Sequence, residues 1–224
     1  MDFKLSIFVE VFPFLLHGAW VTLYISLVSS GIGAALGLCV GMARVSRVRA
    51  IRATAMTYTE AVRGTPLLMQ LIVLYYGLPS VGINLEAIVA GIIGLSANSA
   101  AYVGEIFRAG IQSVGRGQME AAQAGGLTHL QAMRYVILPQ AFRMVLPPLT
   151  NEFVTMLKDS SLVSTLAIAE LLRTGREVVA WKVNVFSPFA GVTLLYLAMT
   201  LPLTRLARSL ERRIDPDRRL SAHL

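Results

Sequence analysis

Long stretches without charged residues dominate this chain of 224 residues. Four of them contain no Asp, Glu, Lys or Arg: residues 11–43, 64–85, 87–104 and 183–204. A helix needs about 20 mainly apolar residues to cross a bilayer, so each stretch can form a membrane span. A fifth apolar stretch, residues 144–169, differs because it contains Glu152, Lys158 and Asp159. The pattern predicts an all-α integral membrane protein with about five transmembrane helices.

Composition and charge support this fold class and add an orientation. The hydrophobic content of 55% and the mean hydropathy of +0.63 are too high for an ordinary soluble domain. Most of the basic residues that produce the net charge of +7 follow the first span, lie in or beside residues 106–142, or lie in residues 205–224. Positively charged loops stay cytoplasmic, which predicts the N-terminus outside, the C-terminus inside, and residues 79–85 and 170–182 outside. Topology and contact with lipid headgroups explain this basicity better than binding of nucleic acid.

The chain shows no internal repeat or linker, and residues 1–224 are predicted to form a single transmembrane domain. The nucleotide-binding pattern G-x-x-x-x-G-K-[ST] is absent, so any ATPase that drives this protein is expected to be a separate chain. His17, His129 and His223 are scattered without the spacing of metal ligands. We therefore expect no metal and no cofactor in this chain.

Small residues recur every four positions in the first span, at Gly33, Gly37 and Gly41. This spacing places them on one helix face, where they allow another helix to approach closely. The partner helix can belong to the same subunit or to a second one. We favour packing inside the subunit.

Residues 116–139 predict two short helices joined by a turn. The first, residues 118–124, is rich in Ala and Glu, and Gly125 and Gly126 then interrupt it. Thr128 and Gln131 have the spacing of a capping box at the start of the second helix. Leu127, Leu130 and Met133 give this second piece an apolar stripe, and Pro139 should kink or restart the helix.

The same segment resembles the EAA loop of permeases from ABC importers, which reads EAA, three residues, Gly, nine residues, an aliphatic residue, any residue and Leu-Pro. The matching positions, together with the Leu that follows the glycine, are Glu120, Ala121, Ala122, Gly126, Leu127, Val136, Leu138 and Pro139. In that family the loop docks on a separate ATPase subunit. The resemblance therefore implies that these residues couple the chain to an ATPase and that the chain itself is not an enzyme.

Further motifs narrow the resemblance to permeases for polar amino acids. Residues 60–70 read EAVRGTPLLMQ, residues 96–102 read SANSAAY, and residues 158–162 read KDSSL, with Ser160 where Thr is commoner. The resemblance implies the type I importer fold and uptake of an amino acid by alternating access. It also implies a bacterial inner-membrane location, a periplasmic solute-binding protein, an ATPase dimer that binds ATP and Mg, and a second permease subunit that is identical or related.

Polar residues inside the apolar stretch 144–169 are the candidates for a substrate pathway: Asn151, Glu152, Thr155, Lys158, Asp159 and Ser161. Charges in a membrane cost about 2.5–3.5 kcal/mol each on insertion scales and usually line a polar path or pair with one another. A zwitterionic amino acid suits a path with groups of both signs. The alternative is an internal ion pair of Lys158 with Glu152 or Asp159.

Two other pairs of opposite charge have helical i,i+3 spacing: Glu60 with Arg63, and Glu105 with Arg108. We expect structural pairing at both, with a cytoplasmic gate as the alternative.

Two other functions fit the sequence less well. An intramembrane serine protease requires buried Ser and His, but the histidines lie at a membrane edge, in a loop and in the tail, and no G-x-S-x-G motif is present. A passive channel needs no EAA loop. The sequence leaves open which amino acid is carried and whether the second permease subunit is a copy of this chain.

Overall fold

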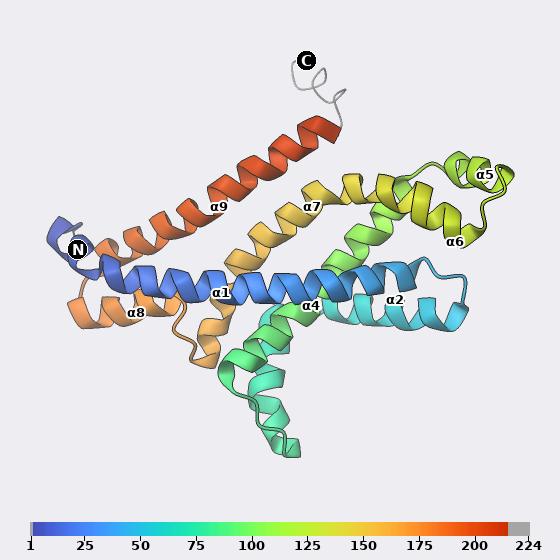
Figure 1. Ribbon diagram of the computed structural model, residues 1–224. Coiled ribbons are helices and arrows are strands. Elements are labelled where there is room, and N and C mark those ends of the chain that lie inside the picture. The colour runs from blue at the N-terminus through green and yellow to red at the C-terminus, as the bar shows by residue number, and fades with distance from the viewer. Residues whose placement is uncertain (1, 215–224) are drawn as a thin grey trace.

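The computed structural model describes residues 2–214, which are almost entirely helical and contain no strand. Figure 1 shows α1 crossing α4 and α7, with α5 and α6 projecting at one end of the molecule and α8 beside the start of α1. The elements are α1 (Leu5–Arg44), α2 (Arg49–Arg63), α3 (Leu67–Ile72), η1 (Val73–Gly77), η2 (Leu78–Val81), α4 (Ala87–Ser113), α5 (Arg116–Ala124), α6 (His129–Ala132), η3 (Met133–Ile137), α7 (Leu138–Asp159), η4 (Ser160–Leu166), α8 (Leu171–Lys182) and α9 (Phe186–Ile214).

Three helices of the described part, α1, α4 and α9, are long and apolar enough to cross a membrane. A fourth span results if α2 and residues 67–81 count as one helix that bends by 99°. The fifth predicted span corresponds to α7 and η4. It does not pass the same test, and its charged residues explain why: Arg143, Glu152, Lys158 and Asp159. The orientation of the chain in the membrane stays a prediction.

Two helices were not predicted. The pattern of residues 49–63 mixes Arg with Ala and Thr and was interpreted as a cytoplasmic loop, and residues 170–182 were interpreted as an external loop. They form α2 and α8 instead, because both segments are amphipathic and pack one face against the bundle. The predicted C-terminal tail includes Arg218, Arg219 and His223, which lie outside the described residues.

The most extensive helix contact in the described part of the chain joins α1 to α4 through the predicted glycine face. A methyl group added to Gly33 would lie 2.7 Å from Ser99 Cβ, and one added to Gly37 would lie 2.5 Å from Val103 Cβ. At Gly41 the nearest atom, Phe107 Cβ, would be 2.6 Å away. These separations are shorter than van der Waals contact, so only glycine allows the two backbones to approach this closely. The glycine face therefore packs inside the subunit, as the sequence favoured.

A buried carboxylate joins α1, α8 and α9. Glu170 has no exposed surface and caps α8 by accepting hydrogen bonds from the backbone N–H groups of Leu172 and Arg173, at 2.9 and 2.7 Å. Tyr196 Oη of α9 donates to the same carboxylate at 3.1 Å, and Thr22 Oγ1 of α1 lies 3.5 Å from it. Since a buried charge is stable only when it is hydrogen-bonded, this junction fixes the three helices relative to one another.

The α1–α4 contact generates a stability prediction with a control in the same helix. Gly37→Val should destabilise the folded subunit by about 1–3 kcal/mol, because the new side chain overlaps Val103 and overpacks the interface. Gly31→Val should have little effect, because an added Cβ there has no atom within 4 Å. The measurement is thermal unfolding of the detergent-solubilised protein. Equal unfolding temperatures for the two variants would show that the contact is not tight.

Candidate functional site

The site begins at a break between α2 and α3. Gly64, Thr65 and Pro66 separate the two helices, whose axes then diverge by 99° when the second helix is followed to residue 81. Pro66 has no backbone N–H and disfavours helical backbone at Thr65, which favours a break of the helix at this point. At the break, residues 64–66 have non-helical backbone, whereas a continuous helix would satisfy its own backbone hydrogen bonds.

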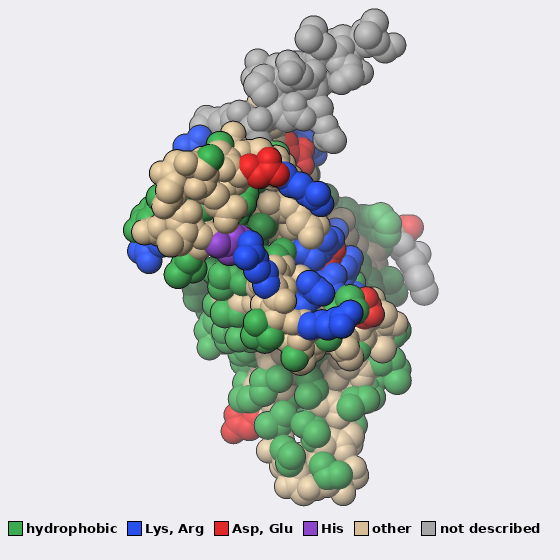
Figure 2. Space-filling view, turned by 90° about the vertical axis from the view of Figure 1, so that its right-hand side faces the viewer, with side chains coloured by type: hydrophobic (Ala, Val, Ile, Leu, Met, Phe, Trp, Pro, Cys, Tyr) green, Lys and Arg blue, Asp and Glu red, His purple; other side chains and the backbone are tan. Residues whose placement is uncertain are grey.

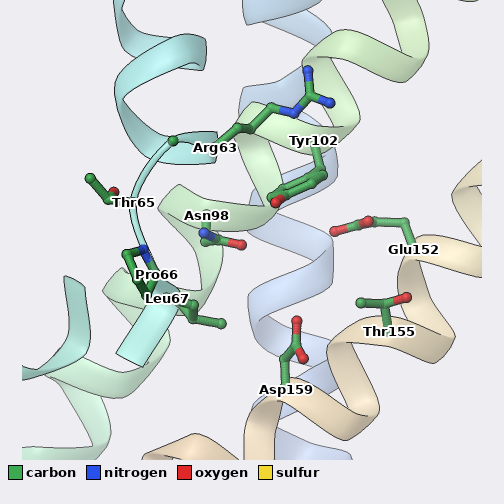
Figure 3. Close-up of a pocket in the computed structure, with 10 residues that line it drawn as sticks. Arg63, Thr65, Pro66, Leu67, Asn98, Tyr102, Glu152, Thr155 and Asp159 are labelled. Carbon is green, nitrogen blue, oxygen red and sulfur yellow. The ribbon is translucent and has the colours of Figure 1, made fainter. Parts of the chain in front are cut away.

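A cavity of about 380 Å³ lies between this break, α4 and α7 (Figure 3). Its size is within the range of small-molecule sites. It is lined by Arg63, Gly64, Thr65, Pro66, Leu67, Asn98, Tyr102, Glu152, Thr155 and Asp159.

The charged groups of the cavity come from opposite walls. Figure 3 shows Glu152 and Asp159 of α7 directing their carboxylates into the space, and Asn98 of α4 facing Glu152 across it. The guanidinium of Arg63 lies over the ring of Tyr102, with Cζ 5.1 Å from the ring centroid. This cation–π contact holds the single positive side chain of the lining at one edge of the cavity.

The predicted pathway residues divide into two groups. Glu152, Thr155 and Asp159 line the cavity, because spacings of three and four residues place them on one face of α7. Asn151, Lys158 and Ser161 lie on other faces and do not line it. In residues 2–214 Lys158 forms no ion pair with Glu152 or Asp159 within 4.0 Å, so the alternative of an internal pair is not what the structure contains.

Four polar lining residues were not predicted as site residues: Arg63, Thr65, Asn98 and Tyr102. They belong to the motifs at residues 60–70 and 96–102, so a signal existed, but sequence spacing does not show which side chains meet across helices.

The two predicted i,i+3 pairs have different outcomes. The predicted Glu60–Arg63 ion pair is not formed among the described residues, and Arg63 contacts Tyr102 instead. The Glu105–Arg108 pair is confirmed, with Arg108 Nε donating to Glu105 at 2.9 Å, and Arg44 of α1 donates to the same carboxylate at 3.2 Å.

The second candidate site consists of α5, α6 and the turn between them, as the sequence predicted. Thr128 caps α6 in a complete capping box with Gln131. Gly126 has φ of +88°, a backbone conformation that side chains disfavour, whereas Gly125 has an ordinary φ of −75°. Pro139 does not end the helical run. It lies near the start of α7, directly after the π-helical turn η3.

One side of this element is anchored and the other is exposed. Met119, Met133 and Val136 pack against the small core formed by Ile111, Ile137 and Ala141. Glu120, Ala121 and Gly126 are exposed, and Leu130 presents 77% of its surface. Of the predicted apolar stripe, Leu130 is therefore exposed, whereas Met133 packs against this core. Figure 2 looks at the molecule from the end where α5 and α6 lie and shows several Lys and Arg side chains on this face.

Comparison with known proteins places the chain in a family. Residues 7–216 match the family described as binding-protein-dependent transport system inner membrane component. The arginine transport system permease protein ArtQ of Bacillus subtilis is 36% identical, over 97% of this chain and 100% of that protein. The glutamine transport system permease protein GlnP of Escherichia coli is also 36% identical, over 96% of this chain and 99% of its own length.

The fold has a close counterpart among solved structures. The crystal structure of an amino acid ABC transporter with histidines superposes with a TM-score of 0.90 at 41% identity, covering 95% of this chain and 100% of that one. A match of this extent covers both the cavity and the α5–α6 element. The chain belongs to the family of binding-protein-dependent inner membrane components and is a permease subunit of an amino acid ABC importer, a transport component rather than an enzyme.

Proposed function

We propose that the cavity between α3, α4 and α7 is the substrate site and that it accepts a cationic amino acid. The observation that carries this proposal is the set of charges in the lining, two carboxylates and one guanidinium. A basic amino acid has the complementary set, because its α-ammonium and its side chain are cationic and its carboxylate is anionic. A neutral amino acid such as glutamine leaves one of the two carboxylates without a counter-charge.

The positions of the charged groups favour the same substrate. Glu152 and Asp159 are separated by about two turns of α7, so they can each receive a different cationic end of an extended molecule. Arg63 lies at the opposite wall, where a substrate carboxylate can approach its guanidinium. Thr65, Asn98 and Thr155 add neutral polar groups that replace part of the hydration of the substrate. Similar proteins named for arginine and for glutamine match equally well in identity, so the charges decide rather than the names.

The exposed α5–α6 element is proposed to dock on the ATPase subunits through Glu120, Ala121, Ala122, Gly126 and Leu127, with Leu138 and Pro139 joining it to α7. Its support is structural: one face is anchored in the bundle and the other is free to contact a partner. ATP and Mg are expected in the ATPase dimer, which drives alternating access of two permease subunits. A solute-binding protein delivers the amino acid from the periplasm of a bacterium, on the side where α8 and the η2–α4 loop lie if the N-terminus is outside.

Glu152→Gln tests the substrate site. Removing this charge should weaken the binding of arginine by about tenfold or more, since hydrogen bonds to charged groups contribute about 1.5–3 kcal/mol. Binding of glutamine should change much less, so the preference for arginine over glutamine should fall. The measurement is competition of the two amino acids for the purified permease–ATPase complex without its binding protein.

Glu60→Gln is the matched control, because Glu60 is exposed on α2 and does not line the cavity. If Glu152→Gln and Glu60→Gln leave arginine binding equally unchanged, the substrate does not bind in this cavity.

Gly126→Ala tests the coupling element, with Gly125→Ala as its neighbour control. An alanine at position 126 must adopt a positive φ, which costs about 1–2 kcal/mol, or shift the turn that orients α5 against α6. An alanine at position 125 meets only ordinary contacts at 3.5 Å. Uptake and substrate-stimulated ATP hydrolysis should therefore fall several-fold for Gly126→Ala and far less for Gly125→Ala, with equal amounts of both proteins in the membrane. Equal transport by the two variants would remove the turn from the coupling mechanism.

The orientation is tested by labelling with a membrane-impermeant maleimide. The single native thiol is removed by Cys39→Ala, and Val81→Cys or Gln123→Cys is then introduced at an exposed position. In right-side-out vesicles the thiol at position 81 should react, and the thiol at position 123 should react only after the vesicles are opened. The reverse pattern would place α5 and α6 outside and exclude docking on a cytoplasmic ATPase.

A further inference from the structure

Gln70 is a polar residue of α3 that does not line the cavity. It forms hydrogen bonds with two residues that do, Thr65 at the break and Asn98 of α4. Its amide nitrogen donates to the carbonyl oxygen of Val62 at 2.7 Å, to that of Thr65 at 3.2 Å and to Thr65 Oγ1 at 2.9 Å. Its amide oxygen accepts a hydrogen bond from Asn98 Nδ2 at 3.2 Å. One side chain therefore connects the end of α2, the break and α4.

The bond to Val62 replaces a hydrogen bond that the sequence cannot form. In a continuous helix, the carbonyl of Val62 would accept from the backbone N–H four residues later, which is position 66. Pro66 has no N–H, so this carbonyl is left without its helical donor. In a membrane protein such a carbonyl must find another partner, and the shortest contact that it makes is with the side chain of Gln70.

The bonds at the break fix one wall of the cavity. Residues 63–67 are five consecutive lining residues, and the carbonyls and hydroxyl that Gln70 binds lie directly before and within this segment. The non-helical residues 64–66 have no hydrogen-bond ladder of their own. The position of Thr65 in the wall therefore depends on the amide of Gln70.

The hydrogen bond between Gln70 and Asn98 fixes the direction in which the amide oxygen of Asn98 points. Because the amide oxygen of Gln70 can only accept, Asn98 must turn its nitrogen towards it. Figure 3 shows the consequence, with the nitrogen of Asn98 on the side of the break and its oxygen on the side of the cavity. The cavity is therefore offered a third acceptor near Glu152, which suits an ammonium group.

We propose that Gln70 is a positioning residue for substrate recognition: it holds the wall formed by residues 63–67 and directs the oxygen of Asn98 at the cationic end of the substrate. This inference rests on the proposal that the cavity is the substrate site. It assigns a role in binding affinity to a side chain that does not contact the substrate.

The test is equilibrium binding of radiolabelled arginine to the purified permease–ATPase complex in the absence of binding protein. Gln70→Met, which keeps the length and removes all the hydrogen bonds, should raise the dissociation constant about tenfold. Asn98→Ala should also raise it. The double variant should weaken binding by less than the product of the two single effects, because the two residues act partly through one contact. Met69→Leu, at the exposed neighbouring position, should leave the constant unchanged.

The number of binding sites and the unfolding temperature separate positioning from a purely structural role. A side chain that only stabilises the fold would reduce the number of sites while leaving the dissociation constant of the remaining sites unchanged, and that result would overturn the inference. If Gln70→Met is not recovered from the membrane, the isosteric Gln70→Glu removes the amide donors with the least change in shape. A dissociation constant within twofold of the wild type for that variant would equally overturn the inference.

Glu152→Gln, measured in parallel, shows which proposal fails: the role of Gln70 or the assignment of the cavity as the substrate site. Weakened binding by Glu152→Gln together with unchanged binding by the Gln70 variants would leave the cavity as the site and remove the role of Gln70. Unchanged binding in both would mean that the substrate binds elsewhere, which removes the role of Gln70 as well.

Discussion

The close contact of α1 with α4 is the constraint on which the rest of the bundle depends. Lipid tails are as apolar as the helices, so the hydrophobic effect contributes little to association inside a bilayer, and close packing must replace it. Gly33, Gly37 and Gly41 allow this packing along about two turns of both helices. With one side of α4 occupied by α1, Asn98 and Tyr102 remain directed towards α7, and the space between them becomes the cavity.

Placing charges in that space requires a departure from regular helices. A straight second span would satisfy its own backbone and close the gap next to α4, whereas the break at Pro66 opens it. Glu152, Asp159 and Arg63 can then share a cavity of about 380 Å³ instead of facing hydrocarbon. The break thus gives the charges a cavity in place of hydrocarbon, and the carbonyl that it leaves without a helical donor accepts a hydrogen bond from Gln70.

The sequence predicted the elements whose signals are local. Uncharged stretches located the apolar helices, the spacing of Gly33, Gly37 and Gly41 located a tight contact, and Thr128 with Gln131 located the start of α6. It did not predict α2 or α8, because short amphipathic helices at a membrane surface lack the long uncharged run that identifies a span. It could not separate Asp159 from Lys158 as a lining residue either. Adjacent residues on a helix point about 100° apart, and only the packing of α7 decides which of them faces the cavity.

The two candidate sites are connected by one helical run. From His129 the chain continues through α6, η3 and α7 to Asp159 without a non-helical residue, and a single π-helical turn of five residues joins α6 to α7. A displacement of the α5–α6 element therefore reaches Glu152 and Asp159 along the helix that carries both. Pro147 and Pro148 lie inside that helix, between the α5–α6 element and the carboxylates, and remove two of its internal hydrogen bonds. Bending at this point can change the distance between α7 and the break at Pro66 while the α1–α4 contact stays closed, which is the kind of movement that opening a cavity to one side of a membrane requires.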